Sequence, residues 1–328
     1  MNMPTIDVNN LTKTYRVYQK KEGLWQAIRG LGRREYKQVQ AVRSISMQVQ
    51  KGEFVAFLGP NGAGKTTTLK LLSGVITPTD GNATVLGHVP WKREDAYRRR
   101  FALVMGQKNQ LWWDLPAQES FRLLQKIYRV PEDQFDNTHN ELIDLLGVQK
   151  LLGQPVRELS LGERMKMELI AALLHRPEIL FLDEPTIGLD VVAQHNIQKF
   201  LKHYQQERKI TILLTSHYMA DITALCPRVL LIHQGQLFHD GPLDRLASRL
   251  APERHVRLEL KQPVPPDTFE GLGRLDSLEN CEVNLRVDPA SLTRVLAQIL
   301  ERFDVRDLEV NDPPIDQLIG ELFRQGSL

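Results

Sequence analysis

The sequence predicts an α/β fold built around a parallel sheet, and two apolar segments carry this prediction. Residues 53–58 (EFVAFL) form a short apolar run, and a glycine-rich loop and a helical pattern follow at once. A second apolar run, 179–182 (ILFL), ends in the acidic pair Asp183 and Glu184. Buried parallel strands have continuous apolar sequences of this kind, and ligands collect at their carboxyl ends.

The loop after the first strand matches the pattern G-x-x-x-x-G-K-[ST] of a phosphate-binding loop. Its glycines allow backbone N–H groups to point at phosphate oxygens, and the following helix turns its positive end toward the same anion. Lys65 is expected to reach the β- and γ-phosphates, and the Thr66 hydroxyl to bind Mg²⁺. A glycine turn without a ligand is the alternative. The predicted nucleotide-binding residues of this loop are Gly59, Pro60, Asn61, Gly62, Ala63, Gly64, Lys65, Thr66 and Thr67.

The acidic pair after the second strand supplies the groups that nucleotide hydrolysis needs. Asp183 is expected to hold Mg²⁺ through water, and Glu184 to polarise an attacking water. The alternative is an ordinary strand that ends in an acidic turn. The phosphate loop upstream favours the hydrolytic site.

Five further segments, in a fixed order, resemble the motifs of the ABC ATPase family. Leu159–Glu163 (LSLGE) resembles the LSGGQ signature, and Thr186–Asp190 (TIGLD) resembles the D-loop. His217, after the strand-like ITILLTS, matches the switch histidine. Gln107, after the strand-like FALVMG, stands where the family has its Q-loop glutamine, and Tyr15 fits the aromatic residue that stacks on adenine.

This resemblance covers about residues 5–241 and implies both a fold and an activity. The implied fold is a P-loop NTPase core, with a RecA-like parallel sheet, an antiparallel β subdomain and an α-helical signature subdomain. The implied activity is ATP hydrolysis by the nucleotide-binding subunit of a transporter, with ATP and Mg²⁺ as ligands. The pattern resembles most the bacterial ABC-2 or multidrug-export branch, which includes daunorubicin-resistance-like proteins, so an exporter is expected.

The family carries roles over to individual residues. Glu184, His217 and Gln107 are the implied catalytic residues, and Thr66, Gln107 and Asp183 the implied metal ligands. The resemblance implies that ATP contacts Tyr15 in one subunit and that Ser160, Gly162 and Asp190 face ATP held by a second subunit. A homodimer or a heterodimer of ATPase subunits is therefore expected, because one such domain cannot close its own site.

Two residues of the signature depart from the family pattern. Leu161 and Glu163 replace the usual Gly and Gln, while Ser160 and Gly162 are kept. A carboxylate at Glu163 is expected to oppose phosphate binding modestly, unless it points away or pairs with Arg164.

Charge and pattern divide the chain into an ATPase domain, residues 1–241, and an accessory domain, residues 242–328. From Gly241 onward there are 11 Lys/Arg and 16 Asp/Glu, a net charge of −5, against +7 for the first 240 residues. The second part is expected to be a small α+β appendix, with strands in VRLEL, EVNLRV and VRDLEV and helices in PASLTRVLAQILERF and PPIDQLIGELFRQ. It is similar to the C-terminal extensions of drug- and antibiotic-exporting ABC ATPases. A dimer brace, a regulatory module and a purely stabilising role remain open.

Two segments are candidates for contacts outside the nucleotide site. A basic insertion over about residues 19–38 places Leu24, Trp25, Ile28 and Leu31 on one helical face and arginines opposite, which suits an anionic lipid surface or a permease groove. Lipid contact is assigned to residues 20–38, and a solvated basic loop is the alternative. Trp112 and Trp113 are expected to dock an integral-membrane permease subunit; packing of one of them in the helical subdomain is the alternative.

Composition narrows the remaining possibilities. No apolar stretch reaches the roughly 20 residues that span a bilayer, and no signal peptide is recognised, so a peripheral position on the cytoplasmic face of the inner membrane is expected. Cys226 and Cys281 match no metal-binding spacing. A net charge of +2 gives no indication of nucleic-acid binding. The alternative function is a non-transport ABC ATPase of DNA repair or translation, whose coiled coil or second phosphate loop is not found here.

Overall fold

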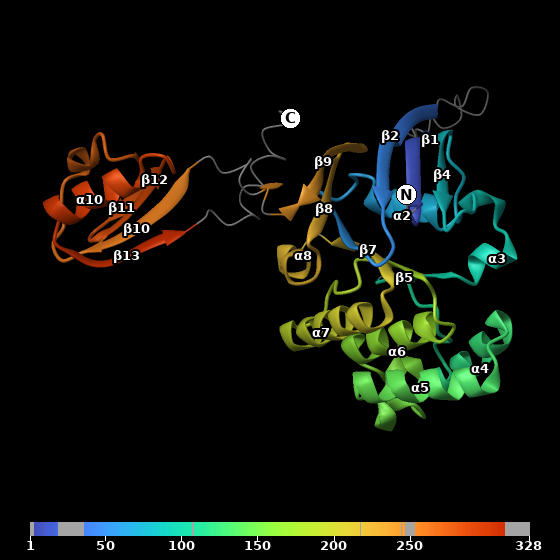
Figure 1. The fold of residues 1–328 in the computed structure, drawn as a ribbon. Helices are drawn as coiled ribbons and strands as arrows, with labels where there is room; N and C mark the ends of the chain where they lie inside the picture. Colours follow the sequence, from blue (N-terminus) through green and yellow to red (C-terminus); the bar gives the residue numbers. More distant parts are fainter. Residues whose placement is uncertain are drawn as a thin grey trace, which may run out of the picture. The chain divides into compact units, whose positions relative to one another are not determined.

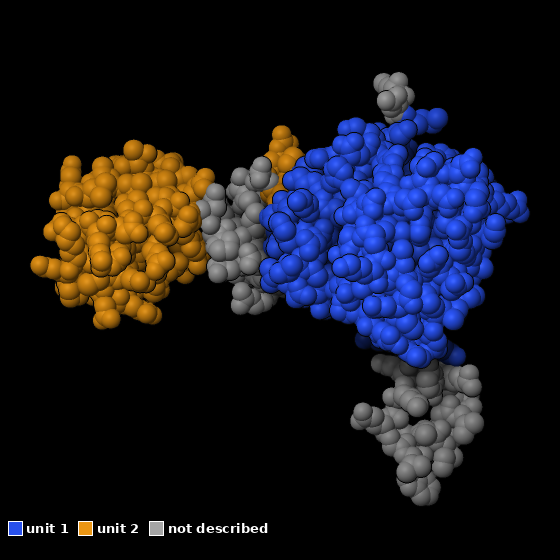
Figure 2. Space-filling view, turned by 90° about the horizontal axis from the view of Figure 1, so that it is seen from below, with its two compact units in different colours: residues 1–241 blue, residues 242–328 orange. Residues whose placement is uncertain are grey.

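The computed structural model describes residues 3–18, 36–106, 108–216, 218–243, 245–246 and 253–311. The chain divides into two compact units, Met1–Gly241 and Pro242–Leu328, which Figure 2 colours separately. Each unit has a hydrophobic core of its own.

A six-stranded sheet in the order β5-β6-β7-β3-β8-β9 forms the centre of the first unit. Its strands are β3 (Phe54–Leu58), β5 (Phe101–Met105), β6 (Ile179–Asp183), β7 (Thr211–Ser216), β8 (Arg228–His233) and β9 (Gln236–Pro242). The first five of these strands run parallel. Every residue of β3 and β6 is buried, which explains their unbroken apolar sequences. The predicted α/β fold with a parallel sheet is confirmed.

A second, antiparallel sheet has the order β2-β1-β4, with strands β1 (Ile6–Tyr18), β2 (Tyr36–Val49) and β4 (Asp80–Val85). Residues 36–38 fall within the stretch predicted to be the basic insertion. They continue β2, with Tyr36 opposite Tyr18 and Gln38 opposite Arg16. Aromatic residues and valines near this end favour strand pairing. Residues 19–35, which hold the predicted helical face, lie outside the described residues.

Helices cover the parallel sheet and form a subdomain of their own. Figure 1 places α4, α5 and α6 at the end of this unit away from β1, β2 and β4. The helices are α2 (Lys65–Leu72), α3 (Asp95–Arg98), α4 (Ala117–Tyr128), α5 (Glu132–Leu146), α6 (Leu161–Leu173), α7 (Val191–Arg208) and α8 (Met219–Leu225). Short 3-10 turns lie at Pro90–Lys92, Gln149–Leu151 and Val156–Glu158.

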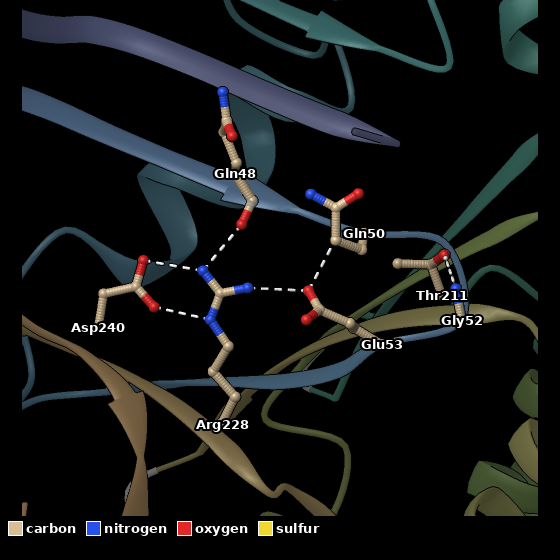
Figure 3. A network of polar contacts seen from close by, with 7 residues as sticks. All are labelled: Gln48, Gln50, Gly52, Glu53, Thr211, Arg228 and Asp240. Atoms are coloured by element: carbon tan, nitrogen blue, oxygen red, sulfur yellow. Dashed lines mark hydrogen bonds and ion pairs between the residues drawn. The ribbon is translucent and has the colours of Figure 1, made fainter. Parts of the chain in front are cut away.

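One arginine links the two sheets of the first unit near the start of β3 (Figure 3). Arg228 begins β8 and donates to both carboxylate oxygens of Asp240, at 2.7 and 2.8 Å. It also donates to Glu53 Oε2 and to the carbonyl oxygen of Gln48, each at 2.8 Å. A planar guanidinium suits this divergent set of acceptors. Since Glu53 directly precedes β3, the network fixes the start of the strand that carries the loop.

In its described residues, the second unit forms a four-stranded antiparallel sheet with one α-helix. The order is β11-β12-β10-β13, with strands β10 (Arg254–Leu260), β11 (Arg274–Glu279), β12 (Glu282–Val287) and β13 (Val305–Asn311). Helix α10 (Leu292–Arg302) buries Val295 and Ile299 in the core of the sheet, and a 3-10 turn lies at Pro266–Phe269. The three predicted strands and the first predicted helix are confirmed. Strand β11 was not predicted, and the predicted last helix lies outside the described residues.

Candidate functional site

The phosphate loop leaves β3 through two glycines that no other residue could replace without displacing backbone. A Cβ on Gly59 would lie 2.1 Å from the carbonyl oxygen of Ile232. Gly64 has φ +108°, and a Cβ there would lie 2.4 Å from the carbonyl oxygen of Ala41. The loop is therefore packed against β8 on one side and against β2 on the other, and its backbone is free to face a ligand.

Lys65 occupies the start of α2 and is almost completely buried, with 5% of its surface exposed. Its Nζ donates to the carbonyl oxygens of Gly59, at 2.5 Å, and Pro60, at 3.1 Å. Burial lowers the pKa of Lys65, while the charges of Glu184 and Asp183 act in the opposite direction. The ammonium is thus held inside the loop, next to the acidic pair that follows β6.

The Asp183 carboxylate, at the end of β6, accepts hydrogen bonds from residues of two other elements. Its Oδ1 accepts a hydrogen bond of 2.8 Å from the Thr66 hydroxyl and one of 2.7 Å from the Thr215 hydroxyl. Asp183 ends β6, Thr66 lies in α2 and Thr215 in β7. The structure therefore brings two of the three predicted metal ligands, Thr66 and Asp183, into direct contact. Hydroxyl and carboxylate oxygens are the donors that Mg²⁺ prefers.

Glu184 adopts a left-handed backbone conformation, with φ +52°. Its N–H donates to the carbonyl oxygen of Thr215, at 3.0 Å, and to the hydroxyl of that residue, at 3.1 Å. On the other side, a Cβ on Gly106 would lie 2.1 Å from the Glu184 carbonyl oxygen. A non-glycine residue keeps such a conformation only where its surroundings enforce it. Here β5 and β7 enforce it from both sides.

The remaining catalytic candidates, Gln107 and His217, lie outside the described residues, but their neighbours are described. The Gly106 N–H donates to the carbonyl oxygen of Asp183 at 2.8 Å, and Ser216 lies opposite Leu58 in the parallel register. Gly106 and Ser216 are thus at the carboxyl edge of the sheet that carries the phosphate loop.

Tyr15 lies in β1, opposite Val39 of β2. Its ring is partly exposed, and the Lys13 Nζ lies 5.3 Å from its centroid. Because Gly64 packs against Ala41 of β2, the hairpin that carries Tyr15 is joined directly to the phosphate loop. Tyr15 is therefore carried by a hairpin that contacts the phosphate loop.

The signature segment forms the N-terminus of α6, and Glu163 turns back onto it. Ser160 is the N-cap and accepts from the Glu163 N–H at 3.3 Å. One oxygen of Glu163 accepts from the Ser160 N–H at 2.9 Å and from its hydroxyl at 2.8 Å. These hydrogen bonds lower the pKa of Glu163. The carboxylate does not pair with Arg164, whose guanidinium lies 5.3 Å from the Trp113 ring centroid.

Helix α7 lies against the signature. A Cβ on Gly162 would lie 2.9 Å from Ala193 Cβ, and one on Gly188 would lie 3.2 Å from a Leu161 methyl group. The unusual Leu161 thus lies near the D-loop, of which Gly188 is a part. Asp190 caps α7 by accepting from the Ala193 N–H at 2.8 Å. The predicted trans-acting residues are therefore gathered at the N-termini of α6 and α7.

A buried carboxylate that the sequence analysis missed connects the D-loop with the switch strand. Asp221, 1% exposed, accepts from Thr186 at 2.5 Å, Ser216 at 2.8 Å and Gln198 at 2.7 Å. Thr215 was also missed as the second partner of Asp183. Thr215 and Ser216 directly precede the motif residue His217, and Thr186 begins the D-loop segment, so their positions in the sequence could have indicated all three. Nothing local indicates Asp221.

Two negative findings apply to the described part of the chain. No helix in it is long and apolar enough to cross a membrane. It also contains no group of three or more His, Cys, Asp or Glu side chains able to hold a metal ion by themselves.

Comparison with known proteins decides the family. The family described as "ABC transporter" matches residues 42–187, and the C-terminal domain family of EvrA-like ABC transporters matches residues 252–311. The ABC transporter ATP-binding protein NatA of Bacillus subtilis is 33% identical over 210 residues, which cover 64% of this chain and 85% of NatA. This chain belongs to the ABC transporter ATP-binding proteins. It is accordingly an ATP-binding subunit with an ATPase domain.

Two further comparisons extend the assignment. The linearmycin resistance ATP-binding protein LnrL of Bacillus subtilis is 28% identical over 299 residues, covering 88% of this ABC protein and 96% of LnrL. The dimeric ATP-binding cassette MJ0796, solved with ADP and Pi, superposes with a TM-score of 0.60 at 22% identity. That comparison covers 73% of this chain and 98% of the solved one, and it supports the ABC ATPase fold.

Proposed function

We propose that this ABC protein hydrolyses Mg²⁺-ATP between two ATPase subunits and thereby drives a separate membrane permease as an exporter. One observation carries the hydrolytic part. The hydroxyl of Thr66 in the phosphate loop and the carboxylate of Asp183 at the end of β6 meet at 2.8 Å, beside the buried Lys65. This arrangement is what a phosphate-bound Mg²⁺ requires of its protein ligands.

Within one subunit, each residue would have a distinct role. The loop N–H groups and Lys65 would bind the phosphates, and Tyr15 would stack on adenine. Mg²⁺ would be held by Thr66, Asp183 and Gln107, and when bound it would neutralise charge on the phosphates. Glu184 would accept a proton from the attacking water, with His217 orienting the γ-phosphate.

The second half of the site would come from another subunit. Ser160, Gly162 and Asp190 lie at two helix N-termini, where backbone N–H groups favour an anion. Val191 and Val192 begin α7 and are 80% and 70% exposed, which suits a surface covered in a dimer. A homodimer and a heterodimer with a different ATPase subunit both fit this geometry. MJ0796 supports the proposal through its dimeric structure.

The permease would bind at Trp112 and Trp113, which are 52% and 45% exposed. Paired exposed tryptophans are favourable interface anchors. The subunit would then lie at the cytoplasmic face of the inner membrane, with residues 20–38 available for anionic lipid. The name of LnrL, a resistance protein, favours export. The longest helix of the described part, α7, has 18 residues, which offers no coiled-coil arm of the kind used in DNA repair.

Substitution of Glu184 tests this function directly. Glu184→Gln should lower the ATPase rate of the purified protein by about 100-fold or more, because a general base contributes at least that factor. ATP binding should persist, and the ATP-bound protein should elute as a dimer in size-exclusion chromatography. Glu207→Gln, an exposed residue of α7, is the matched control and should keep full activity. Unchanged turnover in Glu184→Gln would refute the assigned base.

A further inference from the structure

A buried carboxylate on the signature helix holds the segment that carries the two tryptophans. Glu168 belongs to α6 and is only 3% exposed. Its Oε1 accepts from the Gln110 N–H at 2.8 Å and from the Leu111 N–H at 3.3 Å. These donors immediately precede Trp112 and Trp113. A residue 58 positions away in the sequence therefore fixes the backbone of the tryptophan segment.

Burying the Glu168 carboxylate costs folding free energy, so packing alone does not explain this residue. Burial raises the pKa of Glu168, while the Gln110 and Leu111 N–H groups favour the charged form. The second oxygen, Oε2, is buried and has no hydrogen-bond partner among the described residues. A buried polar atom without a partner destabilises a fold, and an apolar side chain of similar size would avoid that cost. The carboxylate is better explained by the two backbone groups that it holds.

The same helix contacts the segment at a second point. Arg164, one turn before Glu168, places its guanidinium 5.3 Å from the Trp113 ring centroid. The chain just before α6 also pairs with the segment: the Arg157 N–H donates to the Trp113 carbonyl oxygen at 3.0 Å, and the Arg157 side chain pairs with Asp114 at 2.8 Å. The tryptophan segment is thus attached to the signature helix at both of its ends.

The signature serine, Ser160, lies on the same side of α6 as Arg164 and Glu168. Ser160, Arg164 and Glu168 follow one another at intervals of four residues, so they lie near one another along the helix surface. Any rigid movement of α6 that shifts Ser160 must also shift the residues that Arg164 and Glu168 hold.

We propose that Glu168 is a positioning residue that makes segment 110–113 and the signature helix move as one body. A permease bound at the tryptophans would then set the position of Ser160, and ATP bound at Ser160 would set the position of the tryptophans. The inference rests on the proposed function in one respect, since ATP must draw Ser160 toward a second subunit. It requires no particular permease or cargo.

Tryptophan fluorescence of the full-length purified protein tests this coupling. The chain has four tryptophans, so Trp25→Phe and Trp91→Phe leave Trp112 and Trp113 as reporters. A Glu184→Gln background keeps ATP bound. Adding Mg²⁺-ATP should shift the emission and alter iodide quenching. Glu168→Ala should lose this response while still binding labelled ATP, and Glu168→Gln should restore it because its amide oxygen still accepts both N–H groups.

A control separates coupling from loss of stability. Thr138→Val removes another buried hydrogen bond of the helical subdomain, from Arg176 Nε at 2.7 Å, without touching the segment, and should keep the response. An equal response in Glu168→Ala would overturn the inference, as would failure of Glu168→Gln to restore it or loss of the response in Thr138→Val. Failure of the background protein to bind labelled ATP would instead reject the proposed function, and the inference with it.

Discussion

The backbone conformation of the proposed catalytic residue Glu184 is set by close contacts with neighbouring strands, which the local sequence only partly indicates. Glu184 keeps its left-handed conformation because Gly106 and Thr215 hold it from two sides. The glycine at 106 has no role in a recognised motif, yet a side chain there would collide with the proposed catalytic residue. Conformation at the site is therefore enforced by neighbouring strands and not by Glu184 itself.

His175 gives a residue-scale property that follows from burial alone. Its ring stacks on Tyr128 with centroids 3.9 Å apart, and its Nε2 lies 3.1 Å from the Phe101 carbonyl oxygen. Burial lowers the pKa of His175 from 6.5 to about 4, against a smaller opposite effect of the Phe101 carbonyl. The imidazole is therefore neutral in the folded protein at neutral pH, and its Nε2 carries the proton.

The unfolding free energy should depend on this histidine below pH 7. Between the folded pKa of about 4 and the unfolded value of 6.5, the unfolded chain binds more protons. Stability contributed by His175 is complete above pH 6.5 and falls as the pH drops. We expect a loss of about 2 kcal/mol between pH 7 and pH 5. Urea unfolding measures it, and His175→Gln should lack this component; equal pH dependence in both proteins would contradict the expectation.

At the scale of elements, the N-terminus of α6 combines helix capping with a predicted phosphate contact. From the sequence alone, the Glu163 carboxylate is expected to oppose phosphate binding unless it points away or pairs with Arg164. The structure gives it a different partner, since it forms a reciprocal capping box with Ser160. The hydrogen bonds from Ser160 keep its pKa low, so the carboxylate remains charged beside the serine hydroxyl. Helix stability and phosphate affinity are therefore in competition at this position.

Two substitutions of Glu163 separate these effects. Glu163→Gln keeps an acceptor for the Ser160 N–H but removes the charge, so the ATP concentration for half-maximal hydrolysis should fall by about two- to fivefold. Glu163→Ala loses the capping box as well and should lower the unfolding free energy by about 1 kcal/mol. Added salt should reduce the difference between wild type and Glu163→Gln, because it screens the exposed charge. A higher ATP requirement in Glu163→Gln would contradict this account.

At the scale of the whole molecule, the chain combines two units with separate cores. The core of the second unit consists of buried side chains from β10, β12 and α10, together with Phe269 and Leu272. None of its members belongs to the core of the first unit. All proposed ATP-site residues lie in the first unit.

Removal of residues 247–328, nearly all of the second unit, should therefore leave nucleotide binding intact. A chain that ends at residue 246 should bind labelled ATP with the affinity of the full chain. Calorimetry of the full chain should reveal a second unfolding transition that the shortened chain lacks. Lys65→Ala in the full chain serves as the control for lost binding. Loss of ATP binding in the shortened chain would show that the second unit supports the site.

The sequence by itself determined the nucleotide chemistry and the parallel α/β core. Residues 59–66 are contiguous, so their loop geometry follows from local glycines and from the strand and helix on either side. The ends of β3 and β6 were predictable because buried parallel strands are unbroken apolar runs. The order of the later motifs was sufficient to indicate the family, which the comparisons confirmed.

Only the tertiary structure decided how distant residues share this work. Asp183 meets Thr215, Asp221 joins Thr186 to Ser216, and Glu168 holds Gln110 and Leu111. The length of the β1–β2 hairpin was likewise decided by pairing between strands. Such contacts depend on which strands and helices pack together, and a local sequence pattern does not indicate this.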